Sequence, residues 1–119
     1  GPDFPGIAPN PLLSRDARRR TAELRTGALA IGVLVGWREV NSNPRLVLML
    51  DVRTAEGAAF RGIADEDFTL TELARLAPGQ TFPVRYRPAV MDHCVALARD
   101  ADPAEVKRVS DLIDARTHP

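Results

Sequence analysis

Residues 27–53 read GALAIGVLVGWREVNSNPRLVLMLDVR and hold the pattern that decides the fold. Apolar side chains recur at every second position on both sides of the Asn41–Pro44 cluster, and a period of two is typical of a β-strand. Asn side chains tolerate turn geometry, and Pro44 favours an extended Asn43. The stretch therefore predicts two strands joined in a hairpin.

The alternation also predicts which side chains face the interior. In the second strand, residues 45–54, the leucines and Val52 fall on one face and are expected inside. Leu34, Val47 and Met49 then fall on the outer side of a barrel, and exposed apolar residues on adjacent strands commonly mark an interface. Two alternatives stay open for these three residues, a protein interface or cover by the C-terminal helix. The residues of the first strand expected to face inward are Leu29, Ile31, Val33, Val35 and Trp37.

The rest of the chain predicts three more strands and three helices. Thr69 and Glu72 have the spacing of a capping box, in which each side chain accepts a hydrogen bond from the other residue's backbone. Asp102, followed by Pro103 and Glu105, is another typical helix start. The predicted elements are a basic helix at 14–26, strands at 58–64, at 81–87 and up to residue 98, a helix at 70–77 and a helix after residue 102.

This order of elements predicts a mainly β fold with helices, of the α+β class. Five short strands with a helix between the third and fourth are typical of a small OB-like barrel. An SH3-like barrel with an inserted helix is the alternative. The opening Gly1-Pro2 has the form of a remnant of tag removal and predicts that the natural start is missing. The expected organisation is a flexible Pro-rich leader at 1–13, a short basic helix at 14–26, the barrel at 27–99, and a C-terminal helix and tail at 100–119.

Charge and cysteine content exclude several classes of function. Sixteen Lys and Arg residues balance sixteen Asp and Glu residues, so the chain has no net charge that would attract a polyanion. Cys94 is the only cysteine, which excludes an intramolecular disulfide and a CxxC metal site. Fifteen of the basic residues are Arg and seventeen residues are Ala, a bias that indicates a GC-rich bacterial genome.

Two clusters have residue types that occur in catalytic or metal sites. His93 and Cys94 are neighbours on a strand, so their side chains point to opposite faces and cannot form a nucleophile–base pair with each other. We expect Cys94 to be packed and His93 to lie on the surface. The acidic run 65–67 lacks the alternating ligand spacing of a calcium loop and is interpreted as acids that favour the start of the following helix. No catalytic residue, metal site or cofactor is predicted.

Six arginines are candidates for a basic surface. An OB barrel binds single-stranded nucleic acid when a basic stripe is combined with aromatic platforms for stacking. Trp37, Phe82 and Tyr86 belong to inward phases of their strands, so nucleic-acid binding is the weaker interpretation. The arginines of the N-terminal helix also suit anionic lipid headgroups beside a membrane segment. The six candidates are Arg18, Arg19, Arg38, Arg53, Arg85 and Arg87.

Turn and core residues carry a resemblance to a known family. The matching positions are Gly27-Ala28, Asn41-Ser42-Asn43-Pro44, Gly57, Gly79, the run from Phe82 to Pro88 and Val95-Ala96-Leu97. Over residues 27–97 the chain resembles a widespread bacterial family of small β-barrel domains of unknown function, common in membrane-associated and envelope proteins. The family pattern often has an acidic residue where this chain has Arg87. The resemblance implies a barrel close to a membrane and no catalytic residue.

These observations favour a non-catalytic protein-binding or assembly domain of a bacterial membrane-associated or envelope protein, on either side of the membrane. One alternative is a toxin-immunity protein or another partner inhibitor, by analogy with other small single-domain bacterial proteins. The other is an OB-type module for single-stranded nucleic acid. The expected partner is a protein of unspecified identity, and a second copy of the chain is a further candidate.

Overall fold

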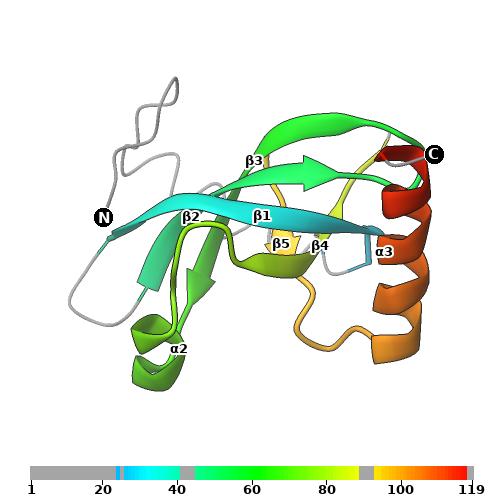
Figure 1. Cartoon of the computed structure of the whole chain (residues 1–119). Helices are drawn as coiled ribbons and strands as arrows, with labels where there is room; N and C mark the ends of the chain where they lie inside the picture. The colour runs from blue at the N-terminus through cyan, green and yellow to red at the C-terminus, as the bar shows by residue number, and fades with distance from the viewer. Residues whose placement is uncertain (1–23, 25, 41–44, 89–92, 118–119) are drawn as a thin grey trace.

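The computed structural model describes residues 24, 26–40, 45–88 and 93–117. The fold is mainly β, because five antiparallel strands curl into a half-barrel that is joined by a short helix and a C-terminal helix (Figure 1). The expected leader and basic helix at 1–26 lie outside the described residues, apart from Leu24 and Thr26. The elements are β1 (Ala28–Glu39), β2 (Arg45–Arg53), β3 (Ala59–Asp67), α2 (Leu70–Ala74), β4 (Thr81–Tyr86), β5 (Ala96–Leu97) and α3 (Pro103–Thr117).

The long strand β1 lies at the centre of the sheet, whose strand order is β3-β2-β1-β4-β5. β1 pairs with β2 from Ile31 to Glu39 and with β4 from Ala28 to Val33. A parallel bridge between Ile63 and Cys94 brings β3 beside the segment that leads into β5. Two backbone hydrogen bonds hold this bridge: Ile63 N donates to His93 O at 2.6 Å, and Val95 N donates to Ile63 O at 2.9 Å. The two outer strands of the sheet are thus joined at one end.

Only part of the predicted core phase is confirmed. The β2 leucines and Val52 lie in the main core, as predicted. In β1 the phase is opposite to the prediction, because Ala30 and Leu34 are in the core whereas Leu29, Ile31 and Val33 are only partly buried. The reason is that both faces of β1 are apolar, so the period of two identifies the strand without choosing the inward face.

Two glycine-linked features explain how β1 packs. The register with β2 shifts between Leu34 and Gly36, and beyond this irregularity Trp37 packs against the core, as predicted. Closer to the start of the strand, a Cβ atom on Gly32 would lie 3.2 Å from Leu50 and 3.3 Å from Val84. β1 therefore has little room for a side chain at Gly32, because side chains of β2 and β4 occupy the space above it.

The capping box at the start of α2 is confirmed. Thr69 Oγ1 accepts a hydrogen bond from Glu72 N at 3.0 Å, and the Glu72 carboxylate accepts one from Thr69 N at 2.9 Å. That backbone hydrogen bond, together with the positive charge of Arg99, lowers the pKa of Glu72. Arg99 also donates to Asp67 O at 2.7 Å and lies over the Phe68 ring, so it ties the exit of β5 to the start of α2.

The acidic run 65–67 belongs to β3 rather than to a helix approach, so the expectation that it precedes the helix directly is wrong. Asp65 and Glu66 are buried. Glu66 Oε2 accepts a hydrogen bond from Leu97 N at 3.0 Å and so continues the contact between β3 and β5 beyond the Ile63–Cys94 bridge. Buried carboxylates need such partners, because removal from water is costly for a charged group.

The C-terminal helix α3 packs against β1. Val109 and Ile113 are its buried residues, four positions apart and hence on one face of the helix. Leu112, one position before Ile113, is 42% exposed. Figure 1 shows α3 along one side of the sheet and α2 at the far end of the barrel, between β3 and β4.

Candidate functional site

The expected interface residues are not exposed. Leu34 is part of the main core and is 1% exposed, because the phase of β1 is inverted relative to the prediction. Val47 and Met49 do lie on the side of β2 opposite the leucine core, but they are only 4% and 0% exposed and form a separate cluster with Ile63. An accessible apolar interface built on these three residues is therefore not found.

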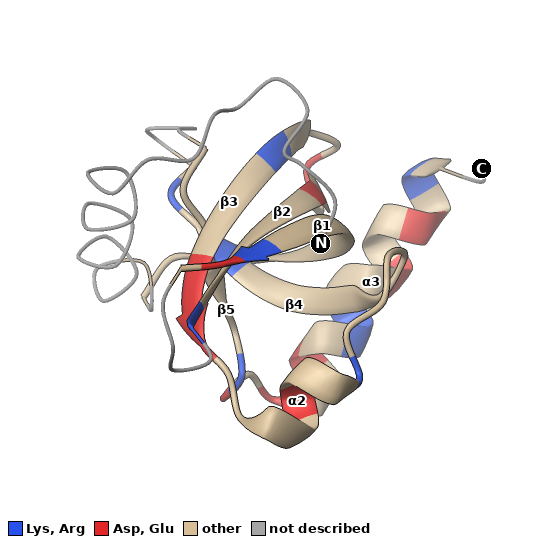
Figure 2. Cartoon of the chain, turned by 90° about the vertical axis from the view of Figure 1, so that its left-hand side faces the viewer, with Lys and Arg blue, Asp and Glu red and all other residues tan. Residues whose placement is uncertain are grey.

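The expected basic residues are dispersed rather than gathered into one stripe. Arg38 and Arg53 are both exposed, but they lie near opposite ends of the β1–β2 hairpin. Arg85 and Arg87 are half-buried. Arg85 Nη1 donates to Gly27 O at 3.0 Å, so this guanidinium links β4 to the residue before β1. Arg18 and Arg19 lie outside the described residues. Figure 2 shows a basic segment near the start of β3 and an acidic segment at its end, so both signs of charge are interspersed.

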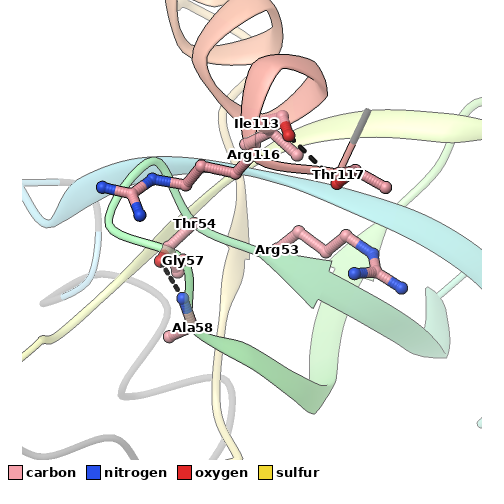
Figure 3. Close-up of a pocket in the computed structure, with 7 residues that line it drawn as sticks. All are labelled: Arg53, Thr54, Gly57, Ala58, Ile113, Arg116 and Thr117. Atoms are coloured by element: carbon pink, nitrogen blue, oxygen red, sulfur yellow. Dashed lines mark hydrogen bonds between the residues drawn. The ribbon is translucent and has the colours of Figure 1, made fainter. Parts of the chain in front are cut away.

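Two neighbouring hollows at the β2–β3 hairpin form the candidate site. The larger, of about 400 Å³, lies over the hairpin strands. The smaller, of about 170 Å³, lies between the hairpin turn and the end of α3 (Figure 3). Arg53 lines both hollows. The larger is lined by Asp51, Val52, Arg53, Ala59, Phe60 and Arg61, and the smaller by Arg53, Thr54, Gly57, Ala58, Ile113, Arg116 and Thr117.

Local hydrogen bonds shape the turn that lines the smaller hollow. Thr54 N donates to Ala58 O at 3.0 Å. Ala58 N donates in return to Thr54 Oγ1, also at 3.0 Å (Figure 3). Gly57 has a φ of 95°, a left-handed conformation that glycine adopts without steric cost. Arg116 Nε donates to Ala55 O at 2.7 Å. The turn and the end of α3 are therefore fixed against each other, and the smaller hollow lies between them.

The guanidinium groups of the site differ in how they are held. Arg61 Nε donates to Asp51 Oδ1 at 2.7 Å, since the two residues are directly opposite in the β2–β3 register. Arg116 is held by the turn carbonyl of Ala55. Within the described residues, the Arg53 guanidinium has neither an ion-pair nor a hydrogen-bond partner, and its side chain is exposed. Arg53 is therefore the cation of this site that is available to a ligand.

Aromatic residues close the barrel beneath the site. Phe60 lines the larger hollow, and its ring lies 5.7 Å from the Tyr86 ring at 51°. Tyr86 Oη lies 3.5 Å from Glu56 Oε2. Burial raises the pKa of Tyr86, and the negative charge of Glu56 raises it further, whereas a hydrogen bond with Thr54 opposes the shift. Phe60 is half-buried, so it packs against the core and lines the hollow at the same time.

Tyr86 is the single tyrosine of the chain, so its titration can be followed by the absorbance of tyrosinate. We expect the folded chain to ionise at a higher pH than the urea-unfolded chain, in which the phenol titrates near about 10. Because the folded pKa is raised, the contribution of this group to stability is present below the unfolded pKa and is lost as the pH rises through the folded pKa. Glu56→Gln should lower the folded midpoint. Equal midpoints in the folded and unfolded chains would contradict the burial of Tyr86.

His93 and Cys94 have the environments that were expected. Cys94 is 4% exposed and packs against Leu24 and Ala96, whereas His93 is exposed and its Nδ1 lies 3.0 Å from Arg61 O. Among the residues that the structure describes, no group of three His, Cys, Asp or Glu side chains is arranged to hold a metal ion. Within the same residues, no helix has the length and apolar character needed to cross a membrane.

Comparisons with family models, curated proteins and solved structures returned no match. Of the residues in the candidate site, the sequence singled out Arg53 as a candidate, and the alternation of β2 also placed Asp51 on the outer side. The position of Arg61 could have been predicted from the sequence, since a turn near Gly57 places it opposite Asp51. The position of Arg116 could not have been predicted, because it depends on how α3 packs against the sheet.

Proposed function

We propose that the chain is a non-catalytic binding domain with an OB-type barrel, which assembles with a partner protein through the β2–β3 hairpin. Three features of the pairing support the OB type over an SH3-like barrel. β1 lies between β2 and β4, so the fourth strand returns beside the first as in a Greek key. The parallel bridge joins β3 to the segment before β5, and α2 lies between β3 and β4.

The exposed guanidinium of Arg53 between two hollows is the observation that carries the proposal. OB barrels bind their ligands mainly on the face of the second and third strands and on the adjacent loops. A guanidinium presents paired donors that match a carboxylate in shape and charge. The partner chemistry that fits is an acidic side chain or a C-terminal carboxylate of another protein, with an apolar neighbour on Phe60.

A protein partner fits the site better than single-stranded nucleic acid does. Nucleic-acid grooves combine cations with exposed aromatic rings on which successive bases stack. Here Trp37, Phe60 and Phe82 pack against the core. A place near a bacterial membrane or envelope, which the family resemblance implies, is part of the same proposal.

The experiment is an NMR titration of the isotope-labelled chain with three probes: a short glutamate-rich peptide, a lysine-rich peptide of the same length, and oligo-dT. We expect the glutamate-rich peptide to shift backbone signals of Arg53, Phe60 and Arg61, and the lysine-rich peptide to leave them unchanged. Arg53→Glu should abolish the shifts. Arg38→Glu is the matched control, because it makes the same charge change at an exposed position far from the hollows.

Two outcomes overturn the proposal. One is the absence of any shift at the hairpin at millimolar concentrations of the glutamate-rich peptide. The other is stronger, salt-dependent binding of oligo-dT through the same residues, which identifies the nucleic-acid alternative instead.

A further inference from the structure

The outer edge of β3 is covered over only part of its length. Toward the end of the strand, Ile63 N donates to His93 O at 2.6 Å, and Glu66 Oε2 accepts a hydrogen bond from Leu97 N at 3.0 Å. Figure 2 accordingly shows β5 near the acidic end of β3. We call residues 59–61, at the start of β3, the open edge, because Ala59 is exposed and no strand of the described chain pairs with them on this side.

The register of β3 leaves backbone groups of the open edge without a partner. In an antiparallel pair, alternate residues direct their backbone N–H and C=O groups away from the neighbouring strand. Ile63 bonds outward in this way, so Ala59 and Arg61, which share its phase, face outward as well. Arg61 O lies 3.0 Å from His93 Nδ1. Within the part of the chain that the structure describes, Ala59 N, Ala59 O and Arg61 N are therefore free to bond to another strand.

The side chains beside the open edge suit an acidic ligand. Ala59 is the register partner of Arg53, and both residues line the larger hollow. A strand added at the open edge lies two strand spacings, roughly 10 Å, from β2. Ala59 carries only a methyl group, so a glutamate opposite it can extend across the alanine toward the Arg53 guanidinium. Arg61 Nε already donates to Asp51 Oδ1 at 2.7 Å, which leaves Arg53 as the residue that selects the charge.

We propose that the partner binds as an extended acidic segment, which adds a strand to the open edge of β3 and places a carboxylate on Arg53. This inference rests on the proposed function and specifies the form of the partner. The unpaired groups of an edge strand are a template for pairing with another chain. In complexes formed by strand addition, main-chain hydrogen bonds provide affinity and alternate side chains provide specificity. The open edge supplies the first and Arg53 the second.

The test uses a peptide of alternating glutamate and threonine residues and measures amide hydrogen exchange of the isotope-labelled chain by NMR. At saturating peptide, we expect exchange of the Ala59 and Arg61 amides to slow by about tenfold, the factor that one amide hydrogen bond supplies. Two further peptides carry N-methyl groups, one on its glutamates and the other on its threonines. Only alternate amides of an added strand face the edge, so one of these peptides should bind about tenfold more weakly and the other as the parent peptide does.

Ala59→Pro removes one of the outward donors. Proline is tolerated on an edge strand where the N–H group faces solvent, so the variant should keep the amide spectrum of the fold. We expect it to bind the parent peptide about tenfold more weakly. Ala59→Ser is the matched control, because it keeps the backbone donor and a small side chain and should bind normally.

The outcomes separate this inference from the proposed function. Peptide-induced shifts at Arg53 without slower exchange at Ala59 and Arg61, or equal weakening by both N-methylated peptides, overturn strand addition and leave the proposed function standing. Exchange that slows as strongly in the Arg53→Glu variant overturns the role of Arg53, and with it the proposed function, whereas strand addition is then confirmed.

Discussion

Arg45→Met is expected to lower the free energy of unfolding by about 3–5 kcal/mol, the range for removing one partner of a buried ion pair. The Asp65 side chain is fully buried, and it accepts hydrogen bonds from Arg45 Nε at 3.0 Å and from Nη2 at 2.7 Å. Methionine retains an unbranched apolar stem but supplies neither charge nor donors. The variant therefore leaves a buried carboxylate without the guanidinium that compensates its desolvation.

Urea unfolding followed by the fluorescence of Trp37, the single tryptophan, measures the loss. Arg61→Met is the matched control, because its pair with Asp51 is exposed and such pairs contribute about 0–1 kcal/mol. Adding Asp65→Leu to Arg45→Met should recover most of the stability, since apolar replacement of both partners is often neutral. Equal losses for Arg45→Met and Arg61→Met would contradict the assignment of Arg45 as the group that compensates the burial of Asp65.

Gly27→Ala is expected to destabilise the fold by about 3 kcal/mol, at the upper end of the range for overpacking. A Cβ atom at this position would lie 2.3 Å from Tyr86 O and 3.1 Å from Leu24 O. Both atoms belong to the backbone, and Gly27 N also donates to Leu24 O at 2.8 Å. The methyl group therefore forces the start of β1 away from the end of β4 and disturbs the packing of Leu24.

Gly62→Ala is the comparison variant for this prediction. Its Cβ would lie 3.1 Å from methyl groups of Val52 and Val95, and these side chains can shift by a few tenths of an ångström. We expect a smaller loss, of about 1 kcal/mol. Thermal or urea unfolding of the two variants gives the order, and a Gly27→Ala variant as stable as Gly62→Ala would show that the Gly27–Tyr86 contact is relaxed in solution.

Sequence reasoning succeeded where one face of an element is polar or where the signal is local. The β2 phase was predicted correctly because Asp51 and Arg53 alternate with the leucines, and the α2 start because Thr69 and Glu72 bond to each other. The inward face of β1 was predicted wrongly, because apolar residues lie on both faces of this strand and only tertiary packing determines which face is buried. Asp65 and Glu66 were misassigned because the partners that allow their burial lie far away in the sequence.

The candidate site was predictable only in its strand positions. Alternation placed Arg53 on an exposed surface, and a strand cannot hide a side chain of that length at its end. The same alternation placed Val47 and Met49 on the outer side correctly, but their burial depends on a cover that no strand pattern encodes. Arg116 lies in the site because α3 packs beside the hairpin turn, and such a tertiary contact has no local sequence signal.

The central place of β1 has a consequence for the speed of folding. Its pairing with β2 and that of β2 with β3 join neighbours in the chain, whereas Arg85 on β4 bonds to Gly27 across 58 residues. Contacts between distant residues form slowly, because loop-closure entropy is lost before they contribute any stability. We therefore expect the β1–β2–β3 meander to form first and the addition of β4 to the free edge of β1 to limit the folding rate, on the scale of roughly milliseconds to seconds.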